Sequence, residues 1–155
     1  MDYRELSKRQ RRELKENRVL TVGTFDLTHI GHIYLFCQCA ELGDTYVAVN
    51  SDEFVERYKG KKPIIPMKER IAMIRSCVFV RHAFENFGEE DLRPVIQKIK
   101  PKYLVVGSDW LDKDYFKQTK LDTKFLDENE VTLVFVPRFI HKSSTDIKRK
   151  ILNEG

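Results

Sequence analysis

The stretch that decides the fold is Arg18-Val19-Leu20-Thr21-Val22-Gly23-Thr24-Phe25-Asp26-Leu27-Thr28-His29-Ile30-Gly31-His32. Its apolar first part has the composition of a buried strand, and the small and polar residues that follow predict a turn into a helix. His29 and His32 are three positions apart, so both side chains would lie on one face of the first helical turn. Imidazole N–H groups there can donate to phosphate oxygens, and a helix N-terminus adds unpaired backbone N–H groups. The stretch therefore predicts a strand-to-helix turn that faces phosphate.

Strands and helices alternate along the rest of the chain. The predicted strands are 18–23, 45–49, 78–80, 103–106 and 131–136. The predicted helices are 30–42, a short one from a cap at 51–52 to 58, 68–75, 89–99, and a last one from a cap at 143–144 to 152. Residues 111–129 are expected to be partly helical. This alternation predicts an α/β fold, a Rossmann-like three-layer sandwich with a five-stranded parallel sheet.

The composition is that of a globular domain with an additional charged segment. The chain has 155 residues, 41% of them apolar and 34% charged, and a net charge of +4. We expect a charged helical extension over residues 1–17 and the folded domain over residues 18–155. Residues 1–18 hold seven basic and four acidic side chains. This mixture of signs favours a solvated helix, so nucleic acid is not the expected partner.

The sequence also bears on location. No apolar run approaches the roughly 20 residues of a membrane span, so no membrane partner is expected. The first residues are too charged for a secretory signal, and a cytoplasmic location is the expectation. The three cysteines, an odd number without an export signal, are expected to be buried thiols: Cys37, Cys39 and Cys77.

Polar clusters follow four of the predicted strands. Ligands of parallel α/β sheets bind at the carboxyl ends of the strands, near the point where the strand order reverses. The clusters are Gly23 to His32, Lys59 to Lys62, Asp109 with Trp110, and Arg138 to Thr145. All four would converge on one crevice.

The clusters carry a family resemblance. GTFDLTHIGH at 23–32 resembles the HxGH signature of the nucleotidyltransferase superfamily, and most closely the GTFDxxHxGH of glycerol-3-phosphate cytidylyltransferases. Residues 138–147 resemble the second signature of that family, RTEGISTTxI. Lys59-Gly60-Lys61 reproduces its K-x-K loop, and residues 107–110 resemble its GDDW. The resemblance covers about residues 18–152 and implies that 18–155 is a nucleotidyltransferase domain.

The resemblance implies transfer of CMP from CTP to a small phosphorylated alcohol such as glycerol 3-phosphate, with release of pyrophosphate. Catalysis would consist of positioning and electrostatic stabilisation, because the attacking phosphate is already ionised. Mg²⁺ would bridge the triphosphate without direct protein ligands, and the protein would be a homodimer. The implied catalytic residues are His29, His32, Lys61 and Arg138, and the acceptor-binding residue is Lys59. The implied nucleotide-binding residues are Gly23, Thr24, Phe25, Asp26, Gly31, Asp109, Trp110, Ser143, Ser144 and Thr145.

Other readings stay open. The adenylyltransferases that make ADP-heptose are resembled equally well by Asn50-Ser51-Asp52, Lys59-Gly60 and Pro63 to Pro66, with Glu69-Arg70. The first alternative is therefore transfer of AMP from ATP to a sugar phosphate or a related phosphate. In the second signature, His141 and Lys142 replace a glycine and an isoleucine of the family. Residues 78–83, which begin at Val78, likewise depart from the RYVDEV of cytidylyltransferases, and these departures leave a nucleotide-binding module without turnover as a second alternative.

Overall fold

Five parallel strands form one sheet in the computed structural model, which describes residues 17–112, 114–138 and 143–155. The order across the sheet is β3-β2-β1-β4-β5, and each neighbouring pair is parallel. The strands are β1 (Arg18–Gly23), β2 (Asp44–Val49), β3 (His82–Glu85), β4 (Tyr103–Gly107) and β5 (Thr132–Val136). The chain leaves β1 toward β2 on one side and returns to β4 on the other, so the order reverses at β1.

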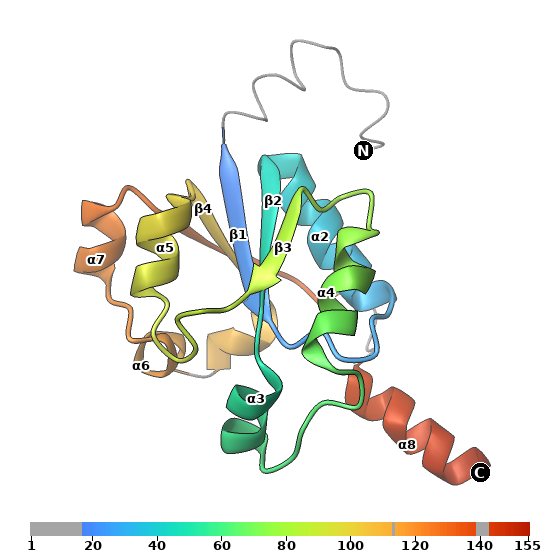
Figure 1. The fold of residues 1–155 in the computed structure, drawn as a ribbon. Helices are drawn as coiled ribbons and strands as arrows, with labels where there is room; N and C mark the ends of the chain where they lie inside the picture. The colour runs from blue at the N-terminus through green and yellow to red at the C-terminus, as the bar shows by residue number, and fades with distance from the viewer. Residues whose placement is uncertain (1–16, 113, 139–142) are drawn as a thin grey trace.

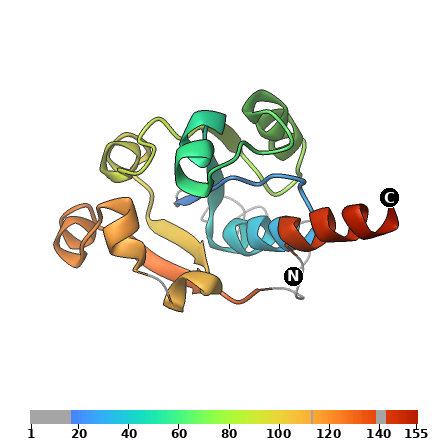
Figure 2. The same ribbon diagram turned by 90° about the horizontal axis from the view of Figure 1, so that it is seen from below.

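Helices cover both faces of this sheet (Figures 1 and 2). The helices are α2 (Ile30–Leu42), α3 (Asp52–Lys59), α4 (Met67–Arg75), α5 (Arg93–Ile99), α6 (Tyr115–Thr119), α7 (Thr123–Glu128) and α8 (Ser144–Glu154), with a 3₁₀ helix η2 (Ser108–Asp112). The helices α2 and α4 lie on one face, and α5, α6 and α7 lie on the other, while α3 lies below the ends of the strands (Figure 1). The predicted three-layer α/β sandwich is confirmed.

The central strands are apolar on both faces because both are covered. Val19 and Leu20 of β1 are fully buried, and they belong to different core clusters. Leu20 packs in the cluster of α5, whereas Val19 packs with Cys39 of α2. A strand buried on both sides therefore reads as a continuous apolar run, which is the pattern of residues 19–22.

The predicted third strand is wrong in position. Residues 78–80 form a turn after α4, in which Val80 donates its N–H to the carbonyl of Cys77, and the Val78 side chain is 82% exposed. The strand β3 begins at His82, and its Ala83 is buried opposite Val47 of β2. Periodicity alone cannot separate a short apolar run that packs as a turn from a strand, and here pairing with β2 decides.

The other boundaries differ by a few residues. The helix α5 begins at Arg93 rather than at residue 89, because residues 86–91 turn through Glu89 at a positive φ of 52°. The segment 111–129 contains α6 and α7, as expected. The predicted helix over residues 1–17 lies almost wholly outside the described residues, which begin at 17. Within the described ranges, none of the helices has the length and apolar character needed to span a bilayer.

Candidate active site

A crevice of about 700 Å³ lies at the carboxyl ends of the strands. Every residue that the sequence assigned to catalysis or binding lines it, although the residues come from segments more than 120 positions apart. Their roles remain predictions, but their convergence is a property of the structure. The lining residues assigned from sequence are Gly23, Thr24, Phe25, Asp26, His29, Gly31, His32, Lys59, Lys61, Asp109, Trp110, Arg138, Ser143, Ser144 and Thr145.

The two histidines start α2 as a reciprocal cap. Nδ1 of His29 accepts the backbone N–H of Gly31 at 3.1 Å, and Nδ1 of His32 accepts the backbone N–H of His29 at 3.3 Å. The rings stack with centroids 3.8 Å apart. A neutral imidazole whose Nδ1 accepts carries its proton on Nε2. The hydrogen-bond pattern thus assigns the Nε2–H tautomer to each ring in its neutral form.

His32 is held neutral by its surroundings. Burial, and then the neighbouring His29, lower the pKa of His32 from its usual 6.5 to about 3, while Asp26 acts weakly in the opposite direction. The ring packs edge-on against Phe25 at 5.3 Å between centroids. At neutral pH His32 is therefore an uncharged donor with a fixed tautomer, suited to stabilising phosphate oxygens rather than to proton transfer.

Asp26, in the turn between β1 and α2, links that turn to residues 64–65 and to α8. Its carboxylate accepts the backbone N–H groups of Ile64 and Ile65 at 2.9 and 3.0 Å, and it pairs with Lys148 of α8 at 3.1 Å. Its backbone carbonyl accepts the hydroxyl of Ser144. Burial opposes ionisation, but the hydrogen bonds from Ile64, Ile65 and Lys148 outweigh it and hold the pKa of Asp26 below its usual value. The carboxylate predicted to contact the nucleotide is thus engaged with protein donors.

Replacing Asp26 with asparagine is expected to lower the free energy of unfolding by about 1.5–3 kcal/mol at pH 7, the usual range for hydrogen bonds to a charged group. Because the pKa is lowered in the folded state, this stabilisation is present above the ordinary carboxyl pKa and is lost as the pH falls below it. Urea denaturation should show wild type and Asp26→Asn converging toward pH 3. Equal stability at pH 7 would contradict this role.

The lysine loop is fixed at one end and exposed at the other. Gly60 follows α3 in the left-handed region, with a φ of 79°, and Lys61 and Lys62 are exposed at the crevice. Lys59 is the last residue of α3 rather than the first of the loop. The downstream end is anchored through Ile64 and Ile65, as described above. This arrangement brings ammonium groups to the mouth of the crevice.

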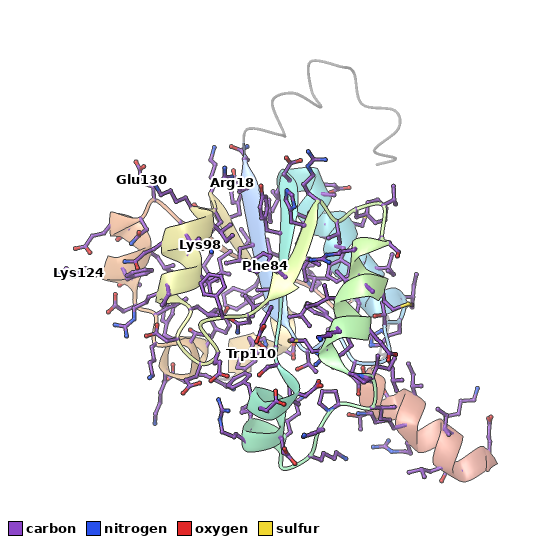
Figure 3. The ribbon with its side chains drawn as sticks, in the orientation of Figure 1. Arg18, Phe84, Lys98, Trp110, Lys124 and Glu130 are labelled. Carbon is purple, nitrogen blue, oxygen red and sulfur yellow. The ribbon has the colours of Figure 1, made fainter. Side chains whose placement is uncertain are left out.

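The start of α8 also lines the crevice. Ser143 caps the helix by accepting the N–H of Asp146 at 3.1 Å, and the N-terminus of an eleven-residue helix adds its positive dipole end to the crevice. Arg138 is exposed at the rim of the crevice, and its backbone N–H donates to the hydroxyl of Ser108 in η2. Trp110 of η2 lies below the strand ends (Figure 3) and packs edge-on against Tyr115. His141 and Lys142 lie outside the described residues.

The sequence did not assign a role to two side chains that the structure places at the site. Arg70 is fully buried: Nε donates to the carbonyl of Ile65 at 2.8 Å, Nη1 to that of Thr24 at 2.5 Å, and Nη2 to that of Asn50 and to the Asp52 carboxylate. Lys148 reaches the crevice one turn beyond Ser144. The sequence marked Arg70 only through the Glu69-Arg70 pair that resembles the ADP-heptose adenylyltransferases. Nothing local marks Lys148.

Fold and site together define a class. A parallel α/β sheet with a capped helix N-terminus and polar side chains at the carboxyl ends of its strands has the features of a nucleotide-binding fold. The chain belongs to the Cytidylyltransferase-like family, whose sequence model matches residues 20–150. The chain is thus a nucleotidyltransferase, and the family implies a nucleoside triphosphate and a phosphate-bearing acceptor.

Three proteins that are similar in sequence to this chain are two FAD synthases and a bifunctional protein. An FAD synthase from Korarchaeum cryptofilum is 30% identical over 140 residues, which cover 87% of this chain and 91% of that protein. An FAD synthase from Methanohalophilus mahii is 32% identical over 117 residues, covering 75% and 80%. The Bifunctional protein HldE of Aliivibrio salmonicida is 40% identical over 108 residues, 68% of this chain but only 22% of HldE. These relatives are not glycerol-3-phosphate cytidylyltransferases, so that narrower resemblance remains a prediction.

A solved structure agrees with the fold. The lipopolysaccharide core biosynthesis protein from Thermoplasma volcanium superposes with a TM-score of 0.61 at 27% identity, over 81% of this chain and 98% of that one.

Proposed function

We propose that this protein transfers AMP from ATP to a phosphate monoester, with FMN as the first candidate acceptor. The observation that carries the proposal is the similarity to FAD synthases, which covers 91% of the length of one of them. FAD consists of AMP joined to FMN, so the name implies adenylyl transfer to a phosphate. The motif at Asn50 to Asp52, which resembles the adenylyltransferases that make ADP-heptose, supports a sugar phosphate as the second candidate acceptor. CTP, favoured from sequence, has less support than ATP.

The chemistry follows from the site. An acceptor phosphate oxygen forms a bond to the α-phosphorus of ATP while the bond between that phosphorus and the α–β bridging oxygen breaks, and pyrophosphate leaves with the bonding electrons. The nucleophile is already ionised, so the protein orients the reactants and stabilises charge. In this proposal the Nε2–H groups of His29 and His32 donate hydrogen bonds to the phosphate oxygens. The negative charge of the departing pyrophosphate is stabilised by Lys61, Arg138 and the start of α8.

Mg²⁺ enters the proposal as an ion carried on the triphosphate. The donors of Asp26 described above make its carboxylate a poor fit for a metal ligand. Mg²⁺ commonly binds substrate phosphates and keeps several waters, so a site with few protein carboxylates suits it. When bound, the ion would neutralise charge on the β- and γ-phosphates.

The test is pyrophosphate release by the purified full chain with Mg²⁺. ATP and CTP are each combined with FMN, with sugar phosphates and with glycerol 3-phosphate. We expect kcat/KM to be at least about tenfold higher with ATP, which corresponds to about 1.4 kcal/mol of discrimination. A preference for CTP would restore the cytidylyl reading. Saturable ATP binding without pyrophosphate from any acceptor would support the binding module.

A further inference from the structure

A buried asparagine next to the crevice has its amide orientation fixed by the backbone. The Asn86 side chain is 1% exposed. One end of its amide lies 2.9 Å from the carbonyl oxygen of Glu89, and the other end lies 3.3 Å from the N–H of Gly88. A carbonyl only accepts and an N–H only donates, so the first end is Nδ2 and the second is Oδ1.

This orientation is passed on to Asn50. Nδ2 of Asn86 also lies 2.9 Å from the Asn50 side chain, and a donor there requires Oδ1 of Asn50. The Asn50 main chain is fixed as well, because its N–H donates to Gly23 and its carbonyl accepts from Arg70. Its amide nitrogen lacks a hydrogen-bond partner within residues 17–112, 114–138 and 143–155, and it is not sealed from solvent. Asn50 therefore presents two N–H donors on an immobilised side chain that lines the crevice.

Asn50 lies beside the end of β1, because its N–H donates to Gly23, and the sheet order places it on the far side of β1 from β4. Asp109 and Trp110 follow β4, whereas Asn50 and Asn86 follow β2 and β3 on the other side of β1. Asn50 directly precedes α3, whose last residue is Lys59, the predicted acceptor residue. The same section of the crevice is bounded by Glu89 and Glu90.

The charges there favour a neutral ligand group. The Glu89 and Glu90 carboxylates share one cation, Arg57, at 2.5 and 3.8 Å. Two carboxylates that share one cation disfavour a phosphate directly beside them. A hydroxyl group suits the section, because its oxygen accepts from the Asn50 amide and its hydrogen can go to a carboxylate.

We infer that Asn50, held by Asn86, recognises a hydroxyl of the acceptor, and that the acceptor class is a phosphorylated polyol. The inference rests on the proposed function and specifies its acceptor. Two sources share this chemistry: the ribityl phosphate segment of FMN and a sugar phosphate. A phosphate ester without hydroxyls lacks the group that Asn50 recognises.

Two variants test the donor separately from the fold. Asn50→Asp keeps an oxygen for Asn86 but cannot donate when ionised. Asn50→Ala removes the donor without adding charge. Binding of FMN, a sugar phosphate, glycerol 3-phosphate and methyl phosphate is measured by calorimetry on the full chain with a non-hydrolysable ATP analogue present. Asn153→Ala, exposed on α8, is the matched control.

We expect both variants to weaken binding of at least one polyol phosphate by about tenfold or more, and Asn153→Ala to leave it unchanged. In Asn50→Ala, binding of methyl phosphate and of the ATP analogue should stay within about twofold of wild type. The relative losses for FMN and for the sugar phosphate identify the source.

The inference is overturned if Asn50→Ala weakens the ATP analogue as much as the polyol phosphate, since Asn50 would then serve the nucleotide. It is also overturned if binding of every polyol phosphate is unchanged, or if wild type binds none of them. Because binding is the readout, absence of pyrophosphate release by wild type would reject the proposed function without deciding this inference.

Discussion

Replacing His32 with asparagine is expected to lower kcat by about 10²–10³-fold, the usual effect of removing one preorganised donor to a charged transition state. The asparagine oxygen can accept the N–H of His29 in place of Nδ1, so the cap at the start of α2 is retained. The free energy of unfolding should change by less than about 1 kcal/mol, and KM should change less than kcat. Steady-state pyrophosphate release, together with urea denaturation, measures all three quantities.

Glutamine at position 32 is the matched comparison, because its amide nitrogen reaches closer to the place of Nε2. We expect His32→Gln to recover part of the activity that His32→Asn loses. If both variants keep wild-type kcat, His32 is not a catalytic donor and the electrostatic account of this site fails.

The lowered pKa of His32 adds a pH signature. The folded state keeps the ring neutral down to about pH 3, whereas the unfolded chain takes up a proton near pH 6.5. The stability contributed by the neutral ring is therefore present above pH 6.5 and is lost progressively as the pH falls from there toward 3. His32→Asn should show a flatter dependence of unfolding free energy on pH in this window.

Replacing Arg70 with methionine is expected to destabilise the fold by about 3–5 kcal/mol, the usual consequence of removing one partner from a buried ion pair. The change leaves Asp52 without its cation. It also removes the donors of three carbonyl groups, which belong to Thr24, Asn50 and Ile65. Chemical denaturation measures the loss as a lowered midpoint with an unchanged slope.

Arg75→Met on the same helix is the control. Arg75 is exposed and donates to the carbonyl of Ala83, so its loss should cost less than about 1 kcal/mol. Arg70→Lys keeps the charge but not the planar fork, and it should fall between the two. Equal stability of Arg70→Met and Arg75→Met would show that the buried hydrogen bonds of the Arg70 guanidinium do not stabilise the fold.

Much of the site was predictable because its parts are local. The run from Gly23 to His32 contains its own strand end, turn and helix cap, so the chemistry and the geometry lie within ten residues. The clusters at Asp109 and Ser143 could be placed since the carboxyl ends of parallel strands meet at one edge. The third strand was misplaced because the competing run at 78–80 is as apolar as a strand, and only pairing with β2 chose residues 82–85.

The sequence by itself determined the α/β alternation, the histidine turn and the class of reaction, because each depends on neighbours in the chain. Tertiary structure alone decided the hydrogen-bond partners of Asp26, Arg70 and Asn50. The partners of Asp26 lie 38 and 39 positions away for Ile64 and Ile65, and 118 positions away for Ser144. Orientation and protonation of a side chain follow from the groups packed against it, and such distant groups become neighbours only when the chain is folded.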